Sequence, residues 1–207
     1  MKIARGAEGI VLSQRKYALD LLKETGILGC KPVTIPIDQK FKLGAEAREP
    51  VDRNRYQRLV GRLIYLSHTH SDISFAVIVV GRYMYDPRKD HINAVYQILR
   101  YLKSAPGKGL IFRKNEHVSI KGYCDSDWAS CADDRRSTLG YCIFIGGNLV
   151  SWKSKKQSVM ARSIAEAEYR AMTLGVAELL WLKSILVELK LDQRAKAGSK
   201  SQDEAMV

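Results

Sequence analysis

Residues 138–158, TLGYCIFIGGNLVSWKSKKQS, decide the fold, because two apolar segments flank Gly146-Gly147-Asn148. Glycine and asparagine accept the positive φ angles of a tight hairpin turn, so this stretch predicts two antiparallel strands. Upstream, residues 109–130 also have the pattern of strands. Downstream, residues 163–190 have helical spacing, with a break or bend expected near Gly175. The second half of the chain is therefore predicted to be a strand–hairpin–helix unit.

The first half predicts helices instead of strands. Apolar residues recur at helical spacing in four segments. These are 13–25, 52–67, 71–85 and 89–103. Ser13 is a candidate cap for the first helix and Gly26 a candidate stop. Residues 30–50 contain three prolines and no periodicity, so they predict a loop or linker.

Positive charge is concentrated in the first half. Residues 1–115 hold 21 Lys and Arg against 10 Asp and Glu, a net charge of +11, whereas residues 116–207 hold 13 against 12, a net charge of +1. A basic segment of this kind points to an anionic partner, of which nucleic acid is the commonest. A solvated basic surface without a partner explains the charge equally well.

Other features concern the cellular setting. No run approaches the roughly 20 apolar residues of a membrane span, and the N-terminus MKIARGAEGI lacks the apolar core of a secretory signal. The four cysteines form no CxxC pair, and we interpret them as reduced, buried residues. These features predict an intracellular protein without a membrane segment, and they do not distinguish nucleus from cytoplasm.

Two carboxylates are the best candidates for chemistry. Asp125 follows a predicted strand, and Glu168 lies early in the predicted helix. A strand–hairpin–helix unit can bring these two side chains together, and a divalent cation relieves the repulsion between neighbouring carboxylates. Acidic residues at such places are more often solvated or interact with the helix dipole. The pattern alone therefore does not establish a catalytic site.

Longer motifs carry a resemblance to a known family. The run from Gly122 to Met172 contains YCDSDWA, DRRSTLGY, SWKSKKQ and AEAEYRA, and it resembles the RNase H segment of copia-type retrotransposon polyproteins. Upstream, GIVLSQRKYALDLLKETG and YQRLVGRLIYLSHTHSDISFAV resemble the end of the reverse transcriptase of the same polyprotein, as does INAVYQILRYLKSAPGKGL. The resemblance extends from Ile3 to Leu191.

The resemblance implies an α/β chain in three parts. Residues 1–115 would be a basic, helical remnant of the reverse transcriptase thumb and connection. Residues 116–191 would be a truncated RNase H-like domain, with an incomplete mixed sheet and packing helices, and residues 192–207 a polar disordered tail. The implied ancestral activity is metal-dependent hydrolysis of RNA in RNA–DNA hybrids.

Site residues follow from the same resemblance. Asp125 corresponds to the first catalytic Asp of the family and Glu168 to its catalytic Glu. Both would be ligands of Mg²⁺ or Mn²⁺, bound weakly if at all. Asp127 and Glu166 are neighbours that we interpret as surface groups.

Basic residues near these carboxylates are candidate contacts for the phosphates of an RNA–DNA hybrid. They are Arg135, Arg136, Lys153, Lys155 and Lys156. A solvated hairpin face is an equally good explanation of their positions.

The sequence also departs from the family. A third catalytic Asp is expected on a strand after the long helix, in a motif like YCDN, and a fourth acidic ligand after it. Residues 1–207 contain neither, nor the paired Asp motif of the polymerase. The chain is therefore expected to be inactive or weakly active, and the alternative is a non-catalytic nucleic-acid-binding remnant. Without the later strand, residues 118–124 would form an apolar open edge, so self-association is expected.

Overall fold

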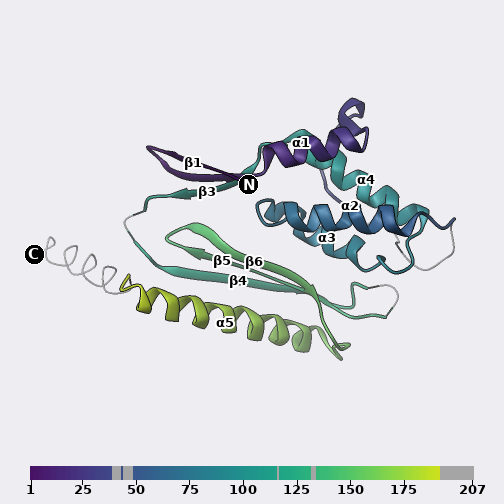
Figure 1. Cartoon of the computed structure of the whole chain (residues 1–207). Coiled ribbons are helices and arrows are strands. Elements are labelled where there is room, and N and C mark those ends of the chain that lie inside the picture. The colour runs from purple at the N-terminus through teal and green to yellow at the C-terminus, as the bar shows by residue number, and fades with distance from the viewer. Residues whose placement is uncertain (39–42, 44–48, 116, 132–133, 192–207) are drawn as a thin grey trace, which may run out of the picture. The chain divides into compact units, whose positions relative to one another are not determined.

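The computed structural model describes residues 1–38, 43, 49–115, 117–131 and 134–191. The predicted tail, 192–207, lies outside the described residues, as does part of the loop predicted at 30–50. The chain divides into two compact units (Figure 1). Unit 1 contains Met1–Ile111, and unit 2 contains Phe112–Cys131 and the chain from Arg135 onward.

Unit 1 is built around four α-helices. They are α1 (Arg15–Glu24), α2 (Arg53–Leu66), α3 (Ser74–Gly81) and α4 (Lys89–Ser104). A short 3₁₀ turn, η1 (Ile27–Gly29), follows α1, and a second one, η2 (Ser71–Ile73), leads directly into α3. Each helix contributes its apolar face to one core, which includes the fully buried Leu21, Leu63, Val80 and Leu99. The helical spacing in the sequence is thus confirmed in all four segments.

Two helix boundaries differ from the prediction. Ser13 does not cap α1, because it ends a strand and Gln14 occupies the cap position without a side-chain cap. Helix α3 ends at Gly81 instead of near Tyr85. The amide of Tyr83 donates to the carbonyl of Val80, three residues back, so the chain tightens into turns at this point.

Unit 1 also contributes a three-stranded sheet. Strands β1 (Lys2–Gly6) and β2 (Gly9–Ser13), which the sequence did not predict, form an antiparallel hairpin, and β3 (Gly109–Arg113), which it did predict, pairs beside β2. Every residue of β1 is exposed, so the strand has no alternating apolar face for a sequence pattern to reveal.

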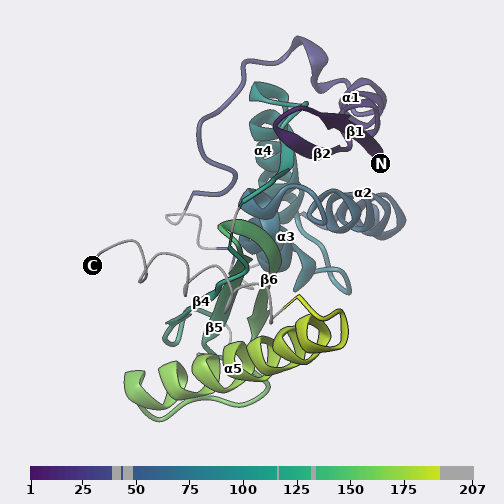
Figure 2. The same cartoon turned by 90° about the vertical axis from the view of Figure 1, so that its left-hand side faces the viewer.

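Unit 2 contains the predicted strand–hairpin–helix arrangement. Strands β4 (Ile120–Asp127), β5 (Thr138–Ile145) and β6 (Asn148–Lys156) form a sheet in that order, and α5 (Ile164–Glu188) runs along it (Figure 2). Gly146 and Gly147 have φ angles of 56° and 76°, as a tight hairpin turn requires. The hairpin prediction is confirmed.

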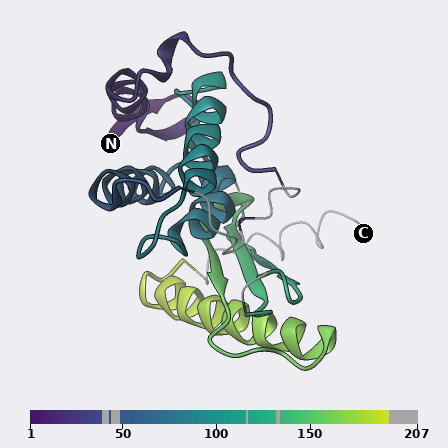
Figure 3. The same ribbon diagram turned by 90° about the vertical axis from the view of Figure 1, so that its right-hand side faces the viewer.

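Two predictions about unit 2 are wrong. The sheet is antiparallel at both of its pairings, not mixed, because the consecutive strands reverse direction at each connection. Helix α5 is continuous through Gly175 and is not broken there. Gly175 is buried, and a Cβ atom at this position would lie 3.5 Å from that of Cys124. A methyl group there would be in ordinary van der Waals contact, so helix and sheet already pack closely at Gly175 (Figure 3).

The cysteines are free, as predicted, but not all are buried. Cys131 is buried, whereas Cys30 and Cys124 are exposed and Cys142 is half-buried. Apolar neighbours in the sequence do not guarantee burial at the edge of a small sheet. Within the described part of the chain, we find no helix of the length and apolarity that a membrane crossing demands.

Candidate functional site

Strand β4 presents alternate residues to helix α5. A Cβ atom on Gly122 would lie 2.8 Å from the side chain of Leu179, and Cys124 lies against Gly175. Ser126, two residues further on, is the one buried residue of the strand. Because side chains alternate along a strand, Asp125 and Asp127 project from the opposite face of the sheet.

The carboxylate of Asp125 is held at the edge of the sheet. The carbonyl oxygen of Ser119 accepts a hydrogen bond from the amide of Gly146, the residue that faces it across the sheet. In an antiparallel pair such bonds occur at every second residue, so the N–H and C=O groups of the odd-numbered residues of β4 point to β5. Those of the even-numbered residues point away from β5, to the outer edge of the sheet. The outward amide of Ser126 donates to Oδ1 of Asp125 at 2.9 Å. This bond draws the exposed Asp125 carboxylate toward the outer edge of β4.

Glu168 lies on the flank of α5 that covers β4. Residues 168, 172 and 179 are spaced to share one side of a helix, and Leu179 lies over Gly122. Glu168 is half-buried, and its neighbours Ala167 and Ala171 are fully buried against the sheet. Glu168 therefore also lies toward the outer edge of β4.

Gln157 forms hydrogen bonds with Ser126, the residue after Asp125, and with Ala167, the residue before Glu168. Its Nε2 donates to Oγ of Ser126 at 3.4 Å and to the carbonyl oxygen of Ala167 at 3.1 Å. Gln157 is only 4% exposed. Hydrogen bonds in such an environment are costly to lose, so they fix the start of α5 beside the end of β4. Gln157 is the last residue of the SWKSKKQ motif, but nothing in the sequence around it indicated this role.

The structure thus places strand β4, which carries Asp125, beside helix α5, which carries Glu168. Among the described residues, no hydrogen bond or ion pair connects the two carboxylates, and no cation pairs with either. The same part of the chain contains no group of three or more His, Cys, Asp or Glu side chains able to hold a metal ion.

Glu166 has a structural role at the start of α5. Its amide donates to Oγ of Ser163 at 3.1 Å, and its carboxylate accepts from the amide of Arg162 at 2.7 Å and from Arg170 at 2.8 Å. The hydrogen bond from the Arg162 amide, followed by those from Arg170, lowers the pKa of the Glu166 carboxyl. Glu166 therefore completes the helix cap.

The predicted basic residues do not form one surface. Lys153 and Lys155 are exposed on the α5 side of β6, whereas Lys156 projects from the opposite side and donates to Sγ of Cys131 at 3.1 Å. Arg135 is exposed in the loop before β5, with a φ angle of 55°, and Arg136 is half-buried.

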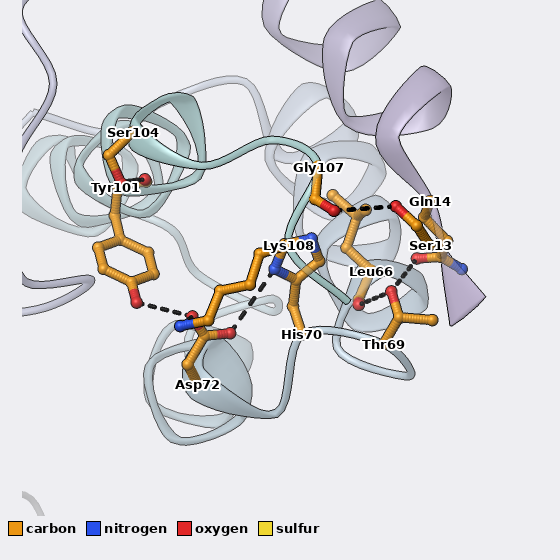
Figure 4. A network of polar contacts seen from close by, with 10 residues as sticks. All are labelled: Ser13, Gln14, Leu66, Thr69, His70, Asp72, Tyr101, Ser104, Gly107 and Lys108. Carbon is orange, nitrogen blue, oxygen red and sulfur yellow. Dashed lines mark hydrogen bonds and ion pairs between the residues drawn. The ribbon is translucent and has the colours of Figure 1, made fainter. Parts of the chain in front are cut away.

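A second polar cluster lies within unit 1 (Figure 4). Asp72 accepts hydrogen bonds from Tyr101 at 2.6 Å and Lys108 at 2.8 Å, and Nδ1 of the buried His70 lies 3.6 Å away. Burial alone would raise the pKa of the Asp72 carboxyl, but His70, Lys108 and Tyr101 together hold it well below its ordinary value. The cluster ties η2 to the end of α4.

Comparisons with known proteins identify the family. The chain is 39% identical over 181 residues to the uncharacterized mitochondrial protein AtMg00810 of Arabidopsis thaliana, with 87% of this chain and 75% of that protein covered. It is 42% identical over 187 residues to the retrovirus-related Pol polyprotein from transposon RE2 of the same plant, with 89% of this chain covered. It is 38% identical over 204 residues to that from transposon TNT 1-94 of Nicotiana tabacum, with 94% covered.

The chain therefore belongs to the family of copia-type retrotransposon Pol proteins. It spans 13% of the RE2 polyprotein and 15% of the TNT 1-94 polyprotein. No family model matches the chain, and no solved structure matches it.

Proposed function

We propose that unit 2 is an RNase H-like unit and that unit 1 corresponds to the end of a reverse transcriptase and its connection. The family and the motifs quoted above support this assignment. The activity proposed for the ancestral unit is metal-dependent hydrolysis of RNA in an RNA–DNA hybrid.

One observation carries the site assignment. Gln157 ties Ser126, the neighbour of Asp125, to Ala167, the neighbour of Glu168. Asp125 is drawn to the outer edge of β4, and Glu168 lies on the helix flank above that edge. These contacts support a site in which the two carboxylates meet at one edge of the unit, although they belong to segments far apart in the sequence.

The two carboxylates suit a hard divalent cation. Carboxylate oxygens are the preferred ligands of Mg²⁺ and Mn²⁺, and both groups are accessible to solvent. When bound, a pair of such ions supplies an activated water and stabilises the leaving oxygen in phosphodiester hydrolysis. Asp125 and Glu168 would hold the cation, while Gln157 would position their elements.

The 207-residue chain by itself is proposed to be inactive. A clamp of two cations needs more negative charge than two carboxylates provide. Residues 1–207 contain no match to the third acidic motif that the family resemblance implies. The chain therefore binds one cation weakly and does not align a water for attack.

A second candidate function is non-catalytic binding of nucleic acid. The observation that favours it is the net charge of +11 on residues 1–115. Several of these cations, including Lys16, Arg53 and Arg58, are exposed on the helices of unit 1. Contacts of this kind reach phosphates without selecting a sequence.

Titration with Mn²⁺, followed by electron paramagnetic resonance, tests the proposed site directly. The chain is expected to bind Mn²⁺ weakly, and either Asp125→Asn or Glu168→Gln is expected to abolish that binding. Asp127→Asn is the matched control, because Asp127 lies on the same strand and face as Asp125. Equal binding by the chain and by both site variants would refute the assignment.

A further inference from the structure

A pocket lies in unit 2 between the end of β6 and the first turns of α5. Its volume is about 130 Å³, several times the roughly 30 Å³ that a water molecule occupies in the liquid. Six of the residues that line it are of three kinds, since two are apolar, two are cationic and two are polar without charge. They are Leu139 and Leu174, Lys155 and Arg170, and Gln157 and Ser158.

The pocket lies on the flank of α5 that faces away from β4. Arg170 and Leu174 are one helical turn apart and share this flank. One turn further on, Glu178 accepts a hydrogen bond from the hydroxyl of Ser151 at 2.7 Å, so the flank lies over β6. Glu168 lies on the other flank, over β4. The pocket therefore uses neither of the proposed metal ligands.

The two cations of the pocket have different roles. Lys155 is exposed, and no described residue pairs with its ammonium group. Arg170 is fixed by Glu166, because its Nε and Nη2 donate to Oε1 of that carboxylate at 3.2 and 2.8 Å. Its Nη1 has no partner among the described residues. Lys155 thus supplies uncompensated charge and Arg170 a positioned donor, whereas the ammonium of Lys156, which also lines the pocket, donates to Cys131.

The uncharged residues of the pocket call for an organic ligand. Gln157 is 4% exposed, and its Oε1 accepts no hydrogen bond from any described residue. A buried acceptor of this kind is costly unless a donor reaches it, and a hydroxyl or amino group of a ligand, or a water that the ligand orders, is such a donor. Leu139 and Leu174 add apolar surface that a small inorganic ion cannot use.

A phosphate monoester combines these properties. It carries a charge of about −1.5 to −2 at pH 7 and three strong acceptor oxygens, which suit an ammonium and a guanidinium together. An internal phosphate of a nucleic-acid strand carries one charge and has a sugar on both sides, so it cannot enter a recess end-on. A nucleotide adds sugar hydroxyls for Gln157 and a flat base for the two leucines.

We propose that this pocket binds a phosphate monoester on a body of nucleotide size, either a free nucleoside monophosphate or the 5′-phosphorylated end of a nucleic-acid strand. This inference is independent of the proposed nuclease function and of the basic surface of unit 1. It can fail while Mn²⁺ still binds at Asp125 and Glu168, and the reverse also holds.

Isothermal titration of the full chain with adenosine monophosphate tests the pocket. Adenosine, which lacks the phosphate, and inorganic phosphate, which lacks the organic body, should each bind at least about tenfold more weakly. Lys155→Gln and Arg170→Gln should each weaken binding of the nucleotide by about tenfold, since each removes a charged donor. Lys153→Gln is the matched control, because Lys153 is exposed on the same strand and face but does not line the pocket.

A second variant avoids the contact between Arg170 and Glu166. Ser158→Asp places a negative charge at an exposed position of the pocket and should abolish binding of the nucleotide without unfolding the chain, which circular dichroism checks. The proposal is overturned if adenosine binds as well as its monophosphate, if Ser158→Asp binds like the parent chain, or if Lys153→Gln weakens binding as much as Lys155→Gln.

Fluorescence anisotropy distinguishes the two sources of the monoester. It compares a single strand that has a 5′-phosphate with the same strand that has a 5′-hydroxyl. Tighter binding of the phosphorylated strand, with a gain that Lys155→Gln removes, would identify strand ends as the ligand. Equal binding of both strands by a chain that binds adenosine monophosphate would identify the free nucleotide.

Discussion

The buried amide of Gln157 donates a hydrogen bond to the hydroxyl oxygen of Ser126 at 3.4 Å, and so links the residue after β6 to the end of β4. The same amide group also holds the carbonyl of Ala167 in the first turns of α5. One side chain therefore connects the strand that carries Asp125 with the helix that carries Glu168.

Replacement of Gln157 should destabilise the chain. Gln157→Ala removes both hydrogen bonds from a buried site, and we expect a loss of about 1–3 kcal/mol in the free energy of unfolding. Urea denaturation followed by circular dichroism measures this loss. Ser158→Ala, the neighbouring exposed position, is the control and should change little. Equal stability of Gln157→Ala and the parent chain would show that the link is not structurally important.

Replacement of Glu166 should lower the stability of the chain, whereas replacement of Glu168 should not. Ser163→Ala removes the cap of α5 and should lower the free energy of unfolding by about 1 kcal/mol. Glu166→Ala should also destabilise the chain, because the Glu166 carboxylate accepts hydrogen bonds from the Arg162 amide and from Arg170. Glu168→Gln should leave the unfolding midpoint nearly unchanged. The assignment of Glu166 to the cap fails if Glu168→Gln is the more destabilising of the two glutamate changes.

Helices were predictable from sequence wherever one face is apolar and the other polar, as in α2 with its cap at Asp52. The hairpin was predictable because Gly146 and Gly147 have few alternatives to a tight turn. Strand β1 was not predictable, since its residues are all exposed and only its pairing with β2 defines it. A polar residue at the end of a strand gives no local sign that it will be buried, so the role of Gln157 depends on how the elements pack.

Stability should depend on pH through Asp72. The pKa of its carboxyl is lowered in the folded chain, so its contribution is present above the ordinary value of 3.8 and is lost as the pH falls below that value. Asp72→Asn should reduce stability by about 2 kcal/mol at neutral pH. Urea titrations at a series of pH values should show this difference narrowing below pH 3.8.

The control for Asp72 is Asp86→Asn, which removes an exposed pair with Arg88 and should change stability by less than about 1 kcal/mol. A stability difference for Asp72→Asn that stays constant across the acidic range would contradict the role assigned to the carboxylate.

Nucleic-acid binding should be steeply salt-dependent and centred on unit 1. Reversal of two exposed cations there, Lys16→Glu with Arg58→Glu, should weaken binding of an RNA–DNA hybrid by about tenfold at low salt and reduce the salt slope. Lys183→Glu with Lys190→Glu makes an equal change in net charge on unit 2 and should have a smaller effect. Fluorescence anisotropy measures both. Binding that is insensitive to salt, or that both double variants weaken equally, would rule out the basic surface of unit 1 as the binding site for nucleic acid.

Cleavage of a labelled RNA–DNA hybrid in Mg²⁺ or Mn²⁺ tests the central claim most directly. The 207-residue chain should show no cleavage above background, because Asp125 and Glu168 alone leave a second cation with too few ligands. A chain extended after Leu191 by the family's later strand and its Asp should gain measurable activity, which Asp125→Asn or Glu168→Gln should abolish. Robust cleavage by the unextended chain, abolished by Asp125→Asn, would contradict the account and mean that another acidic residue completes the site.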